Sequence, residues 1–177
     1  MKYQLTKIAL AAMLGLTAIS TSFAATAGDD DGSFAPGGTA IDQHTQQFHN
    51  LKIVMDLKVK SIADVAFGAV TAGRIISHPG TKLVVIVEGP SINAFAKKNY
   101  LEHQGTIDIW ADLAQKGVKV EYCGNSVHGA GLLPSDMTGL SEKNPAVVNP
   151  GAYPTIANYE SQGYGLVIPM LLEQPKK

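Results

Sequence analysis

The apolar positions along the chain follow two spacings, one typical of strands and one typical of helices. Residues 83–87 form a continuous, mostly β-branched run bounded by turn residues, which predicts a central parallel strand buried on both faces. Residues 51–57 and 118–122 alternate every two positions, as a strand does when its two faces differ. Shorter apolar runs at residues 146–149 and 164–168 bring the total to about five predicted strands.

Between these strands, apolar residues recur every three to four positions, which is the spacing of a helix with one buried face. The clearest case begins at Ser61, which forms a capping-box pattern with Asp64 three residues later. Residues 93–98 suit either a short helix or a loop. The predicted helices begin near Ser61, Thr106, Asn125 and Pro154.

Strands that alternate with helices predict an α/β fold, a three-layer sandwich with a mainly parallel sheet of about five strands. The chain contains neither Gly-x-Gly-x-x-Gly nor the P-loop pattern, so no nucleotide cofactor is expected. We expect a signal peptide at residues 1–24, a flexible segment at 25–50, one folded domain at 51–170 and a C-terminal tail at 171–177.

The signal peptide is predicted from charge and hydropathy together. Lys2 and Lys7 precede a mostly apolar run at residues 8–19, and the small residues Ser22 and Ala24 mark a cleavage site. The run is too short to cross a membrane comfortably, and no later run approaches that length. We therefore expect export to the periplasm and no membrane association once the signal is removed.

The charge of the chain argues against a nucleic-acid partner. The formal net charge is −1, and removal of the two lysines in the signal peptide lowers it to −3. Arg74 is the only arginine, so the basic surface that binds phosphate backbones is missing.

Cys123, the only cysteine, is expected where the strand at residues 118–122 ends. Gly124 and Asn125 then provide a turn and the start of a helix, and ligands of open α/β sheets bind outside the carboxyl ends of the strands. A helix N-terminus beside the sulfur favours the nucleophilic thiolate, so we expect a thiol partly open to solvent. The alternative is a small buried residue that closes the strand.

Other side chains are candidates for the same site. Glu88 follows the central strand, so it is expected at the same sheet edge as Cys123, either as a pocket wall or in a surface salt bridge. His128 either leans over the sulfur or lies in solvent. A metal site of Cys123 with His128 or His103 lacks a third ligand, so no metal is expected. Tyr153 is expected to have a packing role.

Four segments, taken in order, resemble the DsrE/DsrF-like family and its exported members in particular. The resemblance covers residues 51–170 and implies a compact five-stranded α/β sandwich that assembles as a homotrimer or homohexamer. The residues that carry it are Leu113-x-x-x-Gly117-Val-x-Val-x-x-Cys123-Gly-Asn, Leu133-Pro134-x-Asp136, Val147-Val-Asn-Pro-Gly151 and Gln162-Gly-Tyr-Gly-Leu-Val-Ile-Pro169.

The resemblance also implies a function, because the cysteine at this position in sulfur-relay members accepts sulfane sulfur as a persulfide. Cys123 is then the catalytic thiol of a periplasmic sulfur carrier or sulfurtransferase. Its substrate is a small sulfur donor or a partner-protein thiol, next to Gly124, Asn125, Glu88 and His128. Glu88 departs from the family, which often has His there, and a carboxylate close to the sulfur opposes the thiolate. The alternative function is a non-catalytic oligomer that binds a small ligand or a partner in the same crevice.

Overall fold

The structure is a computed structural model that describes residues 48–142 and 147–170. The predicted signal peptide, nearly all of the predicted segment 25–50 and the predicted C-terminal tail lie outside the described residues. The predicted strand at 146–149 also begins outside them, at residue 146.

The described strands form one five-stranded sheet in the order β4-β3-β2-β1-β5. All four pairs of neighbouring strands are parallel. The continuous apolar run becomes the middle strand β2, as its composition predicts for a position buried on both faces. The strands are β1 (Lys52–Leu57), β2 (Lys82–Val87), β3 (Lys119–Cys123), β4 (Val147–Val148) and β5 (Gly165–Val167).

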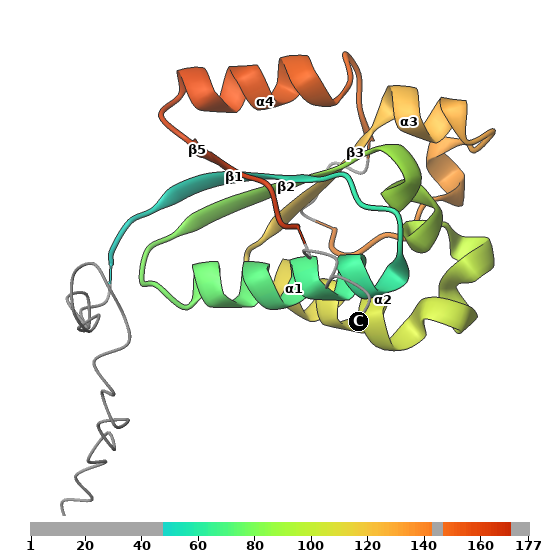
Figure 1. Ribbon diagram of the computed structural model, residues 1–177, viewed down its shortest axis with the longest axis horizontal. Helices are drawn as coiled ribbons and strands as arrows, with labels where there is room; N and C mark the ends of the chain where they lie inside the picture. The colour runs from blue at the N-terminus through green and yellow to red at the C-terminus, as the bar shows by residue number, and fades with distance from the viewer. Residues whose placement is uncertain (1–47, 143–146, 171–177) are drawn as a thin grey trace, which may run out of the picture. The chain divides into compact units, whose positions relative to one another are not determined.

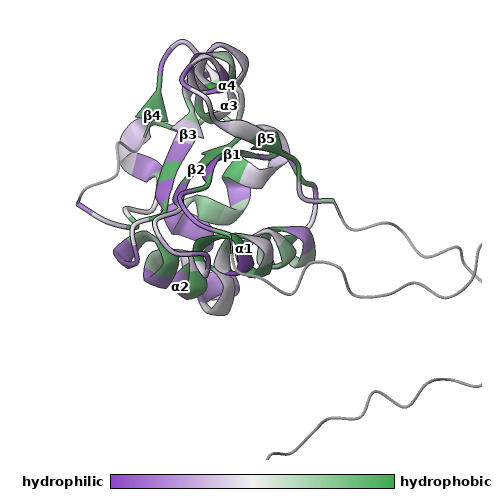
Figure 2. Cartoon of the chain, turned by 90° about the vertical axis from the view of Figure 1, so that its left-hand side faces the viewer, coloured by the Kyte–Doolittle hydropathy of each residue, from purple (hydrophilic) through white to green (hydrophobic). Residues whose placement is uncertain are grey.

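Helices cover both faces of this sheet (Figure 1). Helices α1 (Ile62–Ile76) and α2 (Tyr100–Gln115) lie side by side on one face, and α4 (Ala152–Ser161) covers the other. The short helix α3 (Gly124–Gly129) follows β3 directly at the carboxyl end of that strand. Figure 2 shows the same three layers from the side. The predicted three-layer α/β fold is therefore confirmed.

Helix α1 begins where the sequence predicts because its cap is complete. The hydroxyl of Ser61 accepts a hydrogen bond from the Asp64 amide at 3.1 Å, and the Asp64 carboxylate accepts one from the Ser61 amide at 3.4 Å. Gly68 then lets the helix approach β1 closely, since a Cβ at this position would lie 2.7 Å from Cδ1 of Leu57.

The predicted start of the second helix at Thr106 is wrong, because α2 already begins at Tyr100. Gly105 therefore lies inside the helix on its exposed face, where a glycine costs about 1 kcal/mol in helix propensity. Tertiary contacts offset this cost: Tyr100 packs against the core, and the buried Trp110 donates a hydrogen bond to the Val65 carbonyl at 3.2 Å.

The segment between β2 and α2 is built from 3-10 turns, which decides the prediction left open for residues 93–98. Its elements are η1 (Gly89–Phe95) and η2 (Lys97–Asn99), and a third 3-10 turn, η3, covers Pro134–Asp136. Ile92 and Phe95 of η1 are fully buried, so this segment covers the core between the sheet and α1/α2 at the carboxyl end of β2.

No helix among the described residues is long and apolar enough to cross a membrane.

Candidate functional site

Cys123 lies at the carboxyl end of β3, where the sequence places it, but it is more deeply buried than expected. It is the last residue of the strand and occupies the position just before α3. Only 3% of its surface is exposed, so the expectation of a partly open thiol does not match the structure. The side chain belongs to the apolar cluster between the sheet and α4, together with Val54, Val84, Ile86, Ala152 and Ile156.

Two glycines allow the turn between β4 and α4 to close over Cys123. Gly151 has a φ of 104°, and a Cβ there would lie 3.8 Å from the Cys123 sulfur and 2.6 Å from Nδ2 of Asn125. A Cβ on Gly124 would collide with Oδ1 of Asn149. Gly124 and Asn125, which follow Cys123 directly, therefore pack against Asn149 and Gly151 in the turn that buries the sulfur.

Glu88 stands level with Cys123 on the same face of the sheet. The last paired residues are Leu57 with Val87 and Val87 with Tyr122, so the next residues along the three strands are Lys58, Glu88 and Cys123. The Glu88 amide continues the ladder by donating to the Leu57 carbonyl at 3.1 Å, with extended backbone at Glu88. Strands lie about 4.8 Å apart, so Glu88 is one strand away from Cys123.

Glu88 combines the two roles considered for it from the sequence. It is only 5% exposed, as a pocket wall would be, and it also forms an ion pair. The partner is Lys58, whose Nζ lies 3.2 Å from Oε1 of Glu88. Since the ammonium is half-exposed, the pair joins a buried carboxylate to the surface of the protein.

Asp56 and Tyr153 complete a charged group at this edge of the sheet, which we call the carboxyl-end cluster: Asp56, Lys58, Glu88 and Tyr153. Nζ of Lys58 donates to Oη of Tyr153 at 2.6 Å and lies 5.1 Å from the centre of its ring. The contacts with Tyr153 and Glu88 raise the pKa of Lys58, so its ammonium keeps its charge at neutral pH.

The Asp56 carboxyl is destabilised in its charged form. Its pKa is raised from 3.8 to about 6, mainly by burial and also by the nearby Glu88, whereas Lys58 opposes the rise. Asp56 is therefore mostly ionised at pH 7 but takes up a proton in mildly acidic solution.

The histidines considered from the sequence lie elsewhere. His128 is exposed in the last turn of α3, and His103 lies on α2, across the sheet from the cluster that holds Cys123. Across residues 48–142 and 147–170, no three side chains of His, Cys, Asp or Glu converge so that they could hold a metal ion.

Sequence reasoning missed Asp56, Lys58 and the role of Tyr153. The available signal was Asp56 itself, the single carboxylate inside the apolar run of β1. Tyr153 is not a packing residue as predicted, since it is 63% exposed and accepts a hydrogen bond from Lys58.

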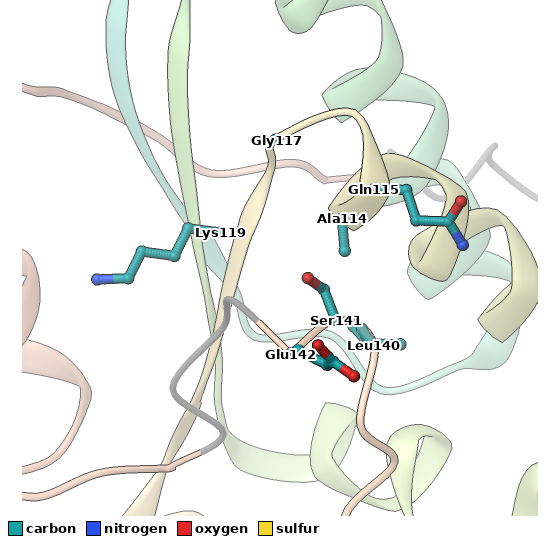
Figure 3. A pocket seen from close by; sticks show the side chains of 7 residues that line it. All are labelled: Ala114, Gln115, Gly117, Lys119, Leu140, Ser141 and Glu142. Carbon is teal, nitrogen blue, oxygen red and sulfur yellow. The ribbon is translucent and has the colours of Figure 1, made fainter.

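Two pockets flank β3 at its opposite ends. The one at the amino end, of about 600 Å³, is shown in Figure 3, where the Lys119 side chain points away from the other labelled residues. The one at the carboxyl end has a volume of about 360 Å³. It is lined by Gly89, Pro90, Asn93, Ser126, Gly129 and Ala130. Because Gly89 follows Glu88 directly and a Cβ there would lie 3.4 Å from Cγ of Lys58, this second pocket adjoins the carboxyl-end cluster.

Two solved structures are similar to this chain. A protein of unknown function from Methanobacterium thermoautotrophicum, MTH1491, matches with a TM-score of 0.57 and 14% identity over 67% of this chain and 99% of its own. A conserved protein of unknown function from Bacteroides thetaiotaomicron, BT1422, matches with a TM-score of 0.48 and 17% identity over 67% of this chain and 95% of its own.

No protein-family model matches the chain, and no curated protein matches it either. At 14% identity the likeness to MTH1491 establishes the shared fold alone. It does not establish membership of the DsrE/DsrF-like family.

Proposed function

We propose that this protein is an exported sulfur carrier of the DsrE/DsrF-like type, which holds sulfane sulfur as a persulfide on Cys123. The observation that supports it most directly is the position of the sulfur between two elements. Cys123 ends an inner strand at the edge of the sheet where α/β proteins bind ligands. Gly151, the N-cap of the ten-residue helix α4, approaches it so closely that a Cβ at Gly151 would lie 3.8 Å from the sulfur. A helix N-terminus stabilises the negative charge of an attacking sulfur.

The burial of Cys123 adds a step to this mechanism. The turn around Gly151 has to move before a donor can reach the sulfur, so opening of this turn controls loading. A closed turn then protects the persulfide from solvent thiols. Thiol exchange of this kind needs access as well as a thiolate, which makes the turn as important as the sulfur.

Export and assembly belong to the same proposal. The charged and apolar pattern of residues 1–24 supports secretion to the periplasm. The resemblance to sulfur-relay proteins supports a homotrimer or homohexamer with closed symmetry.

Mass spectrometry after exposure to inorganic polysulfide tests the carrier function. We expect a mass gain of one sulfur atom on Cys123 that dithiothreitol reverses. Cys123→Ser should not gain sulfur, while its circular dichroism and unfolding midpoint should stay close to those of the wild type because the exchange is nearly isosteric. A wild-type protein that gains no sulfur, and whose thiol iodoacetamide reaches only after unfolding, would contradict the proposal.

A protein that gains no sulfur and keeps its thiol inaccessible until it unfolds would favour a non-catalytic function in binding a small ligand or a partner. The specific observation for this alternative is the pocket of about 360 Å³ at the carboxyl ends of β2 and β3, whose lining includes Gly89 and Ser126 but not Cys123. A ligand can occupy this pocket without touching the sulfur.

A further inference from the structure

Two carboxylate oxygens of the carboxyl-end cluster, Oδ1 of Asp56 and Oε1 of Glu88, are buried without a hydrogen-bond donor among the described residues, although Nζ of Lys58 lies 3.2 Å from the second. Asp56 is 8% exposed, and its Oδ1 is fully buried with no partner among residues 48–142 and 147–170. A buried carboxylate oxygen without a donor is costly, and proteins rarely keep one unless something outside the chain satisfies it. The geometry therefore calls for a donor that the described part of the chain does not provide.

The charge of the cluster indicates which kind of donor fits. Asp56 and Glu88 are two carboxylates, and among the described residues Lys58 is the cation that interacts with both. The Lys58 ammonium is already directed to Glu88 and to Oη of Tyr153. With both carboxyls ionised the cluster carries one net negative charge, so it attracts a cationic hydrogen-bond donor and repels an anion.

The distance to Cys123 limits the size of this donor. Asp56 lies two strands away from Cys123, and its pairing partner Ile86 comes two residues before Glu88, which is level with Cys123. With strands about 4.8 Å apart and a rise of about 3.3 Å per residue, the two α-carbons are roughly 12 Å apart. A short, extended aminothiol persulfide spans such a gap, with a hydrogen bond at one end and the attacking sulfur at the other.

We propose that Asp56 and Glu88 bind the ammonium group of the sulfur donor, so that the donor is a small aminothiol persulfide and not an anionic sulfur compound; this inference rests on the proposed carrier function. The pocket beside Gly89 lies next to this cluster, although none of the four cluster residues lines it. The specificity of the site then lies in one carboxylate of β1 and one that directly follows β2, whereas the reactive sulfur belongs to β3.

The transfer balances without an oxidant. The Cys123 sulfur attacks the outer sulfur of the donor R–S–SH, a new S–S bond forms on Cys123, and the S–S bond of the donor breaks. The electron pair of the broken bond stays on the amine-bearing thiolate, which takes up the proton released by Cys123. The products are Cys123–S–SH and R–SH.

Two donors of similar length and opposite charge test the inference on the full-length protein. We would compare the initial rates at which cysteamine persulfide and 3-mercaptopropionate persulfide add sulfur to Cys123, measured by mass spectrometry at pH 7.5. The ammonium donor should load Cys123 about tenfold faster or more. Asp56→Asn should reduce this preference to nearly one, mainly by slowing the ammonium donor.

Glu121→Gln is the matched control. Glu121 is also a buried carboxylate on the α4 face, and its Oε2, like Oδ1 of Asp56, has no hydrogen-bond partner among the described residues. Its Oε1 pairs with Nζ of Lys119 at 2.7 Å, and it lies two residues before Cys123 along β3. This variant should keep the donor preference of the wild type.

The outcomes separate this inference from the function on which it rests. Equal rates for the two donors, or a preference that survives in Asp56→Asn, would overturn the ammonium site and leave the carrier function intact. If neither donor nor polysulfide loads Cys123, both proposals fail together. Loss of the preference in Glu121→Gln as well would show a general effect of charge and would also overturn the site.

Discussion

The two faces of the sheet are built from the same strands, yet they differ in chemistry. Towards α1 and α2 the strands present an almost wholly apolar surface, and the core there includes both long helices. Towards α4 the apolar cluster is small, and three carboxylates are buried beside it. Successive residues of β1 show the contrast, since Leu57 faces the large core and Asp56 faces α4. The α4 face carries Val54, Asp56, Ile86, Glu88, Glu121 and Cys123.

This difference teaches that apolar burial and buried charge are separated across a single layer. A buried charge destabilises a fold unless it is fully paired, and Asp56 is not fully paired. The α1/α2 face provides the burial that allows the α4 face to keep such a group. Active sites commonly retain groups that lower stability in this way.

The largest expected effect comes from truncating a residue of the α1/α2 face. Leu57 is fully buried, so Leu57→Ala removes apolar contacts and leaves a cavity against α1. We expect the free energy of unfolding to fall by about 2–5 kcal/mol in urea denaturation. Val70→Ala on the exposed side of α1 is the control and should change it by less than about 0.5 kcal/mol. Similar losses for the two variants would contradict the assignment of the core.

Replacement of Asp56, which neighbours Leu57 in β1 but faces α4, should raise the free energy of unfolding instead of lowering it. The pKa of Asp56 is about 6 in the folded protein and 3.8 as its ordinary value. The folded state therefore holds the Asp56 proton more tightly than the unfolded state does. The protonated carboxyl contributes its full stability to the fold below about pH 4, and this contribution is lost as the pH rises through about 6. Asp56→Asn should raise the free energy of unfolding at pH 7 by up to about 3 kcal/mol, since one pKa unit corresponds to about 1.36 kcal/mol.

The pH dependence provides the check on this sign. The difference in unfolding free energy between Asp56→Asn and the wild type should grow from pH 4 to pH 7, as measured by urea denaturation across that range. A variant that is less stable than the wild type at pH 7 would show that the Asp56 carboxylate stabilises the fold, and the contrast between the two faces would lose its main support.

The smallest effect is expected for a hydroxyl on the α4 face. Oη of Tyr159 accepts a hydrogen bond from Lys119 at 2.8 Å and donates one to Glu121 at 3.2 Å. Tyr159→Phe removes both bonds but keeps the ring packed on Tyr164, so it should cost about 1 kcal/mol in thermal or urea unfolding. A loss above about 3 kcal/mol would mean that Glu121 depends on this hydroxyl more than on its ion pair with Lys119.

Much of the fold could be predicted from the sequence because short-range patterns determine it. The unbroken apolar run of β2 indicated a strand buried on both faces, and the Ser61 and Asp64 pair indicated the start of α1. The start of α2 was wrong because Gly105 and Thr106 resemble a helix boundary locally. The packing of Tyr100 outweighs that local signal.

The sequence alone determined that a thiol and a carboxylate, Cys123 and Glu88, follow neighbouring strands of a parallel sheet. Only the tertiary structure decided that the thiol is buried, because the turn at Gly151 that covers it comes from a distant part of the chain. The same holds for Asp56, Lys58 and Tyr153, which the pairing of β1 with β2 and the position of α4 bring to one edge. Local patterns specify which element forms, whereas partners and burial depend on long-range packing across the sheet.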